Sequence, residues 1–120
     1  MSYTASNGNT VQAQTTGLPP VVSLSAVSAA GAGTALDGAC IRPNAVMTVS
    51  TSTGVSAGSV QLQGSLDNAH WFSLGSAVTT SAASTTTQVT VSNALVRYVR
   101  ANVATLITGG TVTCSVGLQG

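Results

Sequence analysis

Short runs in which an apolar residue alternates with Ser, Thr or Gln constrain this chain more than any other feature. Five such runs follow residue 20, and they span residues 22–28, 45–50, 59–63, 88–92 and 111–116. Two further runs, 70–74 and 96–103, contain aromatic residues and are also expected to form strands. Period-two alternation places successive side chains on opposite faces of a strand, and Val and Thr favour pleated, half-buried strands. Since no stretch has a sustained helical period, the sequence predicts an all-β fold.

Links that contain Gly, Asn or Asp separate these runs, and such residues are typical of turns. The links are Asp37-Gly38, Ser52-Thr53-Gly54, Asp67-Asn68 and Thr108-Gly109-Gly110. Short strands at a spacing of roughly ten residues predict an antiparallel β-sandwich or a small barrel. We therefore expect a jelly-roll-like sandwich of about seven or eight strands, formed as a single domain by residues 21–120 of the 120-residue chain.

Residues 1–20 differ from the rest because they are polar and interrupted by Gly and Pro. A Pro pair favours an extended backbone, so we predict an extended N-terminal arm that becomes ordered against a partner. A mobile terminus is the alternative. The residues expected to contact a partner are Tyr3, Gln12, Leu18, Pro19 and Pro20 from the arm, with Arg42 and Arg100 from the domain.

The alternation also predicts which side chains form the core. On the long run 96–103, we expect Val99, Ala101 and Val103 to face inward and Tyr98 and Arg100 to face outward. The core residues expected over the whole chain are Val60, Leu62, Trp71, Val89, Val91, Val99 and Cys114. Trp71 would fill a core otherwise made of small residues, so its replacement by Ala should cost about 3–5 kcal/mol. Cys114 is expected to be a small buried residue, with a disulfide to Cys40 as the alternative.

Charged residues make up only 4% of the chain, and the formal net charge is +1. The chain has no Lys and no Glu, and its charged residues are Asp37, Arg42, Asp67, Arg97 and Arg100. So weak a field excludes strong electrostatic binding to nucleic acid. A surface with so few charges must be covered by Ser and Thr or be hidden against a partner, and we expect an assembly.

The sequence contains neither an apolar run of about 20 residues nor a segment with the charge and hydropathy of a secretory signal. We therefore expect no membrane association and synthesis in a host cytoplasm.

Rare side chains gather in residues 60–75, which hold the only His, Trp and Phe of the chain. A Ser-His-Asp set would have to pair His70 with Asp37 or Asp67, and Asp67 lies across a predicted turn, where it would orient the ring poorly. Two acids and two separated Cys residues give no metal site. We therefore predict no catalytic residue, no cofactor and no metal.

Arg97 and Arg100 flank Tyr98 and should lie on opposite faces of one strand. We expect one of the two to pair with Asp37 or Asp67, and a glycan or carboxylate clamp is the alternative.

Two segments resemble a known family. Residues 60–71, VQLQGSLDNAHW, resemble the V-x-L-x-G-S-x-D-G-x-x-W strand–turn–strand of discoidin-like, galactose-binding-like jelly rolls, with Asn68 where the family has Gly. Residues 97–100, RYVR, resemble a strand near the C-terminus of the same domains. Residues 97–103 followed by 108–112 resemble small virion proteins of tailed bacteriophages. The first segment is framework in the lectins, so it carries no glycan site onto Asp67 or Trp71.

The resemblance implies a structural virion protein, most simply a capsid decoration (cement) protein on the capsid surface. Such a protein would bind across neighbouring major capsid subunits and form homotrimers at threefold positions. One alternative is a carbohydrate-binding or host-attachment module, for which the candidate side chains are Trp71, Phe72, Tyr98, His70 and Arg100. Another alternative is a component of a tail tube or tail fibre.

Overall fold

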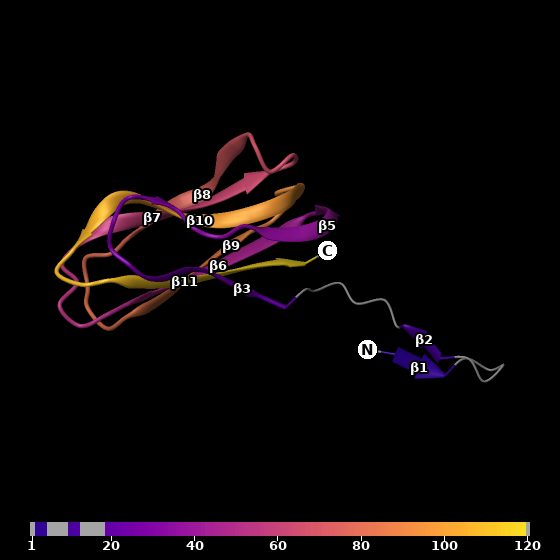
Figure 1. The fold of residues 1–120 in the computed structure, drawn as a ribbon, viewed down its shortest axis with the longest axis horizontal. Helices are drawn as coiled ribbons and strands as arrows, with labels where there is room; N and C mark the ends of the chain where they lie inside the picture. Colours follow the sequence, from indigo (N-terminus) through magenta and orange to yellow (C-terminus); the bar gives the residue numbers. More distant parts are fainter. Residues whose placement is uncertain (1, 5–9, 13–18, 120) are drawn as a thin grey trace.

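Two antiparallel β-sheets pack face to face in the computed structural model, which describes residues 2–4, 10–12 and 19–119 (Figure 1). The sandwich is built from β3 (Val21–Val27), β4 (Gly31–Ala32), β5 (Leu36–Arg42), β6 (Asn44–Thr51), β7 (Ala57–Ser65), β8 (Trp71–Thr79), β9 (Thr86–Val91), β10 (Val96–Thr108) and β11 (Val112–Gln119). This architecture confirms the predicted all-β sandwich. In the described part of the chain, no helix has the length and apolar character needed to span a membrane.

The strand order is that of a jelly roll. One sheet has the order β3-β11-β6-β9, and the other has β4-β10-β7-β8, with β5 pairing to the same edge of β10 as β4. We name them the β6 sheet and the β7 sheet after a central strand of each. Apart from β4–β5 and β7–β8, each connection between consecutive strands crosses from one sheet to the other. Two four-position sheets linked in this way define the double Greek key of a jelly roll.

The core lies between the sheets, where the predicted alternation is confirmed on the central strands. Ala45, Met47 and Val49 of β6 are buried, as are Val60 and Leu62 of β7. On β10, Val99, Ala101 and Val103 point inward, whereas Tyr98 and Arg100 are half-buried on the outer face. Cys114 is also buried, and both thiols are free, so no disulfide joins Cys40 to Cys114. Val89 and Val91, on the edge strand β9, are only half-buried at the margin of this core.

Trp71 does not fill the core, which corrects the sequence-based expectation. It is half-buried at the start of the edge strand β8, opposite Ser65. Ser65 shares the outer face of the β7 sheet with Tyr98, its partner on β10, whereas Leu62 and Leu74 form the inward pair. The volume expected of Trp71 is supplied instead by several medium-sized side chains, of which Met47 and Leu62 are the largest that are fully buried.

One further expectation is wrong for a local reason. Asp37-Gly38 is not a link between strands, because it lies within β5. Ala39 there has a φ of 65°, and the pairing of β5 with β10 shifts register between Val96 and Tyr98. Arg97 is half-buried near the start of β10, and its guanidinium lies 5.1 Å from the centroid of the Tyr98 ring.

A buried hydroxyl joins the first strand of the sandwich to the opposite sheet. Ser23 Oγ accepts a hydrogen bond from the Ala101 backbone N–H at 2.9 Å and donates to the Thr34 carbonyl at 2.7 Å. The backbone at residue 33 passes so close to Ser23 that only Gly fits there, because a Cβ would collide with the Ser23 carbonyl. Residues 33 and 34 thus fix β3 against β10.

The predicted arm contains a short strand pair, in which β1 (Ser2–Thr4) runs antiparallel to β2 (Thr10–Gln12). The expected contact residues Tyr3 and Gln12 belong to this pair, but their side chains lie outside the described residues, as does Leu18 altogether. Pro19 and Pro20 are described, and both are exposed.

Candidate functional site

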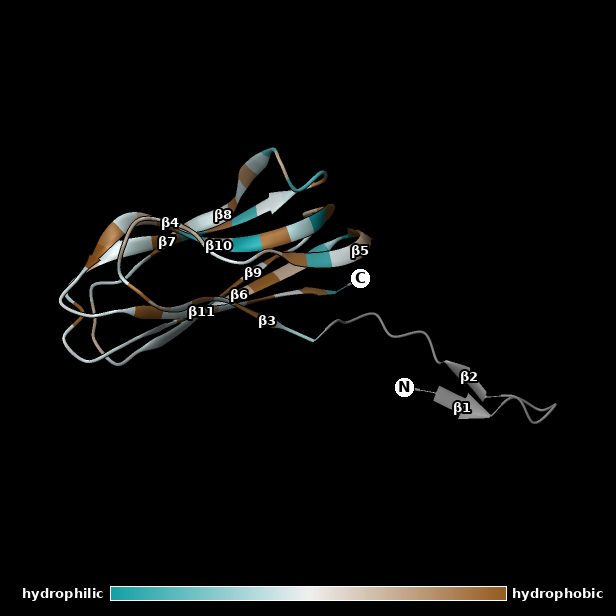
Figure 2. Cartoon of the chain, in the orientation of Figure 1, coloured by the Kyte–Doolittle hydropathy of each residue, from teal (hydrophilic) through white to brown (hydrophobic). Residues whose placement is uncertain are grey.

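The two ends of the sandwich differ sharply in chemistry. At one end β3, β6, β8 and β10 begin while β5, β7, β9 and β11 finish, as the strand registers show. We call this the aromatic end; it is the right-hand end of the sandwich in Figure 1. Its strand ends and links carry all five charged residues, His70, Trp71, Phe72 and Tyr98. In Figure 2, hydrophilic teal segments stand out on β5 and β10. The opposite links 52–56, 80–85 and 109–111 consist of Ser, Thr, Gly and Ala with one Val.

Large apolar side chains are exposed at the same end. Within residues 19–119, six large apolar side chains are exposed, and five of them lie there, namely Val22, Ile41, Leu66, Phe72 and Leu95. The sixth, Leu106, lies towards the other end of β10. Exposed apolar groups that cluster, rather than being scattered singly, mark interaction surfaces.

Arg100 and Trp71 contact each other on the outer face of the β7 sheet at this end of the sandwich. The Arg100 guanidinium lies over the Trp71 ring, 4.0 Å from its centroid. Arg100 Nε donates to Gln63 Oε1 at 2.8 Å, and Gln63 is the β7 residue paired with Arg100. Partial burial lowers the pKa of the guanidinium, although an Arg with so high an ordinary pKa stays charged. The side chain is thus held in one orientation by a ring and an amide.

Arg97 is engaged differently. It forms a two-point contact with Asp37 of β5, in which Nε donates to Oδ1 at 2.9 Å and an Nη donates to Oδ2 at 3.2 Å. The predicted pairing of one Arg with Asp37 or Asp67 is thereby confirmed. The hydrogen bonds from Arg97, followed by one from the Ala39 backbone N–H, lower the pKa of the Asp37 carboxyl.

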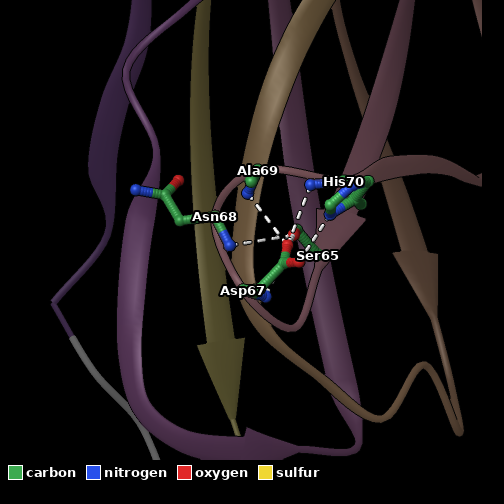
Figure 3. Close-up of polar contacts among 5 residues, drawn as sticks. All are labelled: Ser65, Asp67, Asn68, Ala69 and His70. Carbon is green, nitrogen blue, oxygen red and sulfur yellow. Dashed lines mark hydrogen bonds and ion pairs between the residues drawn. The ribbon is translucent and has the colours of Figure 1, made fainter.

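The β7–β8 link is closed by Asp67 (Figure 3). Its Oδ1 accepts hydrogen bonds from the backbone N–H groups of His70 at 2.8 Å and Ala69 at 2.9 Å. Its Oδ2 lies 2.6 Å from His70 Nδ1, so Asp67 does orient the ring, contrary to expectation. Hydrogen bonds from the His70 backbone, the His70 ring and then the Ala69 backbone hold the pKa of Asp67 far below its ordinary value.

Ser65 completes this turn rather than offering a nucleophile to His70. Its buried hydroxyl donates to Asp67 Oδ1 at 3.0 Å and accepts from the Asn68 backbone N–H at 3.0 Å. Asn68 has a φ of 61°, which explains why Asn can stand where the resembling family has Gly. Within the described residues, no group of three or more His, Cys, Asp or Glu side chains could hold a metal ion.

A shallow apolar hollow continues the aromatic end onto the β6 sheet. Its floor is formed by three residues that pair across β11, β6 and β9, namely Gly117, Val46 and Thr90. Gly117 has no side chain to fill the hollow. Pro20 forms part of its wall, directly where residues 1–18 join the sandwich. Of the predicted partner contacts, the structure therefore brings Pro20, Arg42 and Arg100 to one end. Arg42 is half-buried there, and its Nε donates to the Gly38 carbonyl at 2.8 Å.

Sequence reasoning missed that the exposed Leu and Ile residues gather with these groups. Ile41, Leu66 and Leu95 each lie at or next to a strand end. Which strand ends are neighbours depends on how the strands pair, and the alternation of residues does not predict that pairing.

No protein-family model and no curated protein matches this sequence. A solved structure shares the fold: the crystal structure of the SPBc2 prophage-derived protein YomS matches with a TM-score of 0.67. The match covers 92% of this chain and 98% of that chain at 14% sequence identity. A protein of phage origin thus has the same fold, and at this identity the likeness concerns the fold alone.

Proposed function

We propose that this protein is a non-enzymatic structural component of a tailed-phage particle, and specifically a capsid decoration protein. The observation that carries the proposal is the unequal chemistry of the two ends. One end gathers the exposed apolar, aromatic and Arg side chains, and these types are enriched at protein interfaces. The opposite links, made of small and hydroxyl residues, suit a surface that faces solvent. A fold shared with a prophage-derived protein supports the phage origin.

In this proposal the aromatic end contacts the major capsid protein on the capsid surface. Exposed Ile41, Leu66 and Leu95 would leave water on contact, at about 25 cal/mol per Å² of apolar area. Residues 1–20, which enter beside Pro20, would extend the contact onto a neighbouring capsid subunit. Self-association as a homotrimer would repeat these contacts, and repeated contacts raise the apparent affinity of each copy. The proposal requires neither a cofactor nor nucleic acid nor a membrane.

The first test is the location of the protein in purified particles of the phage or prophage that carries its gene. Decoration predicts density on the head at regular positions and a trimer in solution. Density in a ring or fibre would instead assign the chain to the tail, and absence from the particle would contradict the proposal.

The second test compares two matched leucines. Leu66 at the aromatic end is 54% exposed, and Leu106 towards the other end is 57% exposed. Leu66→Asn should weaken co-sedimentation with capsids about tenfold because an interface contact is lost, whereas Leu106→Asn should leave it unchanged. Equal behaviour of the two variants would show that the aromatic end is not the contact surface.

A carbohydrate-binding or host-attachment module is the second candidate. The contact between Trp71 and Arg100 favours it, because aromatic rings and fixed polar groups together recognise sugars. A glycan that binds the isolated protein and shifts its Trp fluorescence would support this candidate, and the next subsection gives the experiment that separates it from a protein partner.

A further inference from the structure

Arg100 is the only described Arg of β10 without a carboxylate beside it. The chain has two acidic side chains, and both are engaged: Asp37 binds Arg97, and Asp67 binds His70 and two backbone N–H groups (Figure 3). Within residues 19–119, the Arg100 guanidinium uses only Nε as a donor, towards Gln63. Its two Nη groups therefore keep four N–H donors that no described residue accepts.

The fixed position of Arg100 makes those donors a prepared binding group. The guanidinium is stacked on the Trp71 ring and hydrogen-bonded to Gln63. The side chain has therefore already lost most of its rotamer freedom, and binding a ligand costs little further entropy. Partial burial has also removed part of its hydration. An incoming carboxylate can accept two parallel N–H bonds from such a group, and this geometry is stronger than a neutral hydrogen bond.

We propose that Arg100 is the anchor of the particle contact and receives an Asp or Glu carboxylate of the partner protein, while apolar residues of that partner cover Leu66 at the same end of the sandwich. This inference rests on the proposed function and identifies the chemistry of its contact surface. A partner protein fits better than a saccharide, because exposed apolar side chains surround the end on which Arg100 and Trp71 lie. A second copy of the chain fits less well, because both of its acidic side chains already have partners within the chain.

The test compares Arg100→Gln with Arg97→Gln, two substitutions that remove the same charge three residues apart. Binding to purified capsids is measured by co-sedimentation at increasing NaCl, and the melting temperature of each variant is checked. We expect Arg100→Gln to weaken binding at least about tenfold and to flatten its salt dependence. Arg97→Gln, at the same end of the sandwich, should weaken binding clearly less than Arg100→Gln, because Arg97 is already paired with Asp37 within the chain.

Arg100→Lys provides a variant that keeps the charge but loses the planar fork, and an intermediate loss is expected. If Arg100→Gln does not fold, this variant decides the matter. Wild-type binding with equal affinities for the Arg100 and Arg97 variants would overturn the anchor while leaving the proposed function intact. Failure of the wild-type protein to bind particles would overturn both.

A final arm addresses the saccharide. Trigalacturonate and neutral galactotriose are titrated against the isolated protein, and fluorescence is read from Trp71, the only Trp in the chain. No saturable change is expected from either sugar. Saturation by trigalacturonate that disappears in Arg100→Gln would show that the carboxylate comes from a glycan, and would overturn the protein-partner proposal.

Discussion

Ser23 is a buried polar residue, and two hydrogen bonds compensate for the loss of water around its hydroxyl. Its hydroxyl is the acceptor for the buried Ala101 N–H and the donor to the Thr34 carbonyl. Removing the hydroxyl leaves a buried N–H without a partner, and such a loss costs about 1–3 kcal/mol. Ser23→Ala should therefore lower the free energy of unfolding by that amount in urea titrations. Ser25→Ala, which changes an exposed Ser of the same strand, should have an effect within about 0.5 kcal/mol.

Asp67 makes stability depend on pH in a direction that its contacts determine. Its pKa in the folded protein lies below the ordinary value of 3.8, so the ionised carboxylate favours the folded state. That contribution is fully present above pH 3.8 and is lost as the pH falls towards the lowered pKa. Asp67→Asn should therefore melt at a lower temperature than wild type at pH 7, and the two melting curves should converge in strong acid. A difference that persists or widens on acidification would contradict this assignment.

At the scale of elements, the position of Trp71 on the outer face of β8 changes the expected cost of removing it. A side chain that is half-buried and packed under a guanidinium contributes less to the free energy of unfolding than one enclosed between the two sheets. Trp71→Ala should cost about 1–2 kcal/mol, whereas Leu62→Ala should cost about 2–5 kcal/mol. Chemical denaturation of the two variants provides the comparison, and a larger loss for Trp71→Ala would place the ring in the core after all.

The strands that alternation predicts and those that it misses have a common explanation. β6, β7 and β11 bury one face continuously, so their alternating patterns identify both the strands and their inner residues. β5 combines Asp37, Gly38 and a positive φ at Ala39, and these features resemble a turn although β10 holds the segment as a strand. Tertiary pairing overrides local propensity there.

The candidate site was predictable only in part. The pairing of an Arg with an Asp and the outward position of Arg100 follow from charge and period two. The contact of Arg100 with Trp71 depends on which strand lies between them, and local patterns contain no such information.

At the scale of the whole molecule, the two thiols report on opening of the sandwich. Cys40 is exposed on β5, whereas Cys114 is buried in the core, and burial raises its pKa to about 12. A thiol reagent should modify one Cys rapidly in the native protein and the second only as the molecule unfolds. The measurement is the reaction of thiols against time with and without denaturant. Rapid modification of both in native buffer would show that the sheets separate easily.

The strand order also governs how long the chain takes to reach this structure. The first strand of the sandwich, β3, pairs with the last, β11, and Val21 lies opposite Val116. A contact between residues so distant in sequence forms only after a large loop has closed, and closing the loop costs conformational entropy before the contact can stabilise the chain. β-Sandwiches accordingly fold in milliseconds to seconds. During synthesis the β6 sheet lacks β11, one of its two central strands, until residues 112–119 have been added. The edges of β3 and β6 that pair with β11 therefore stay unpaired until that strand is present.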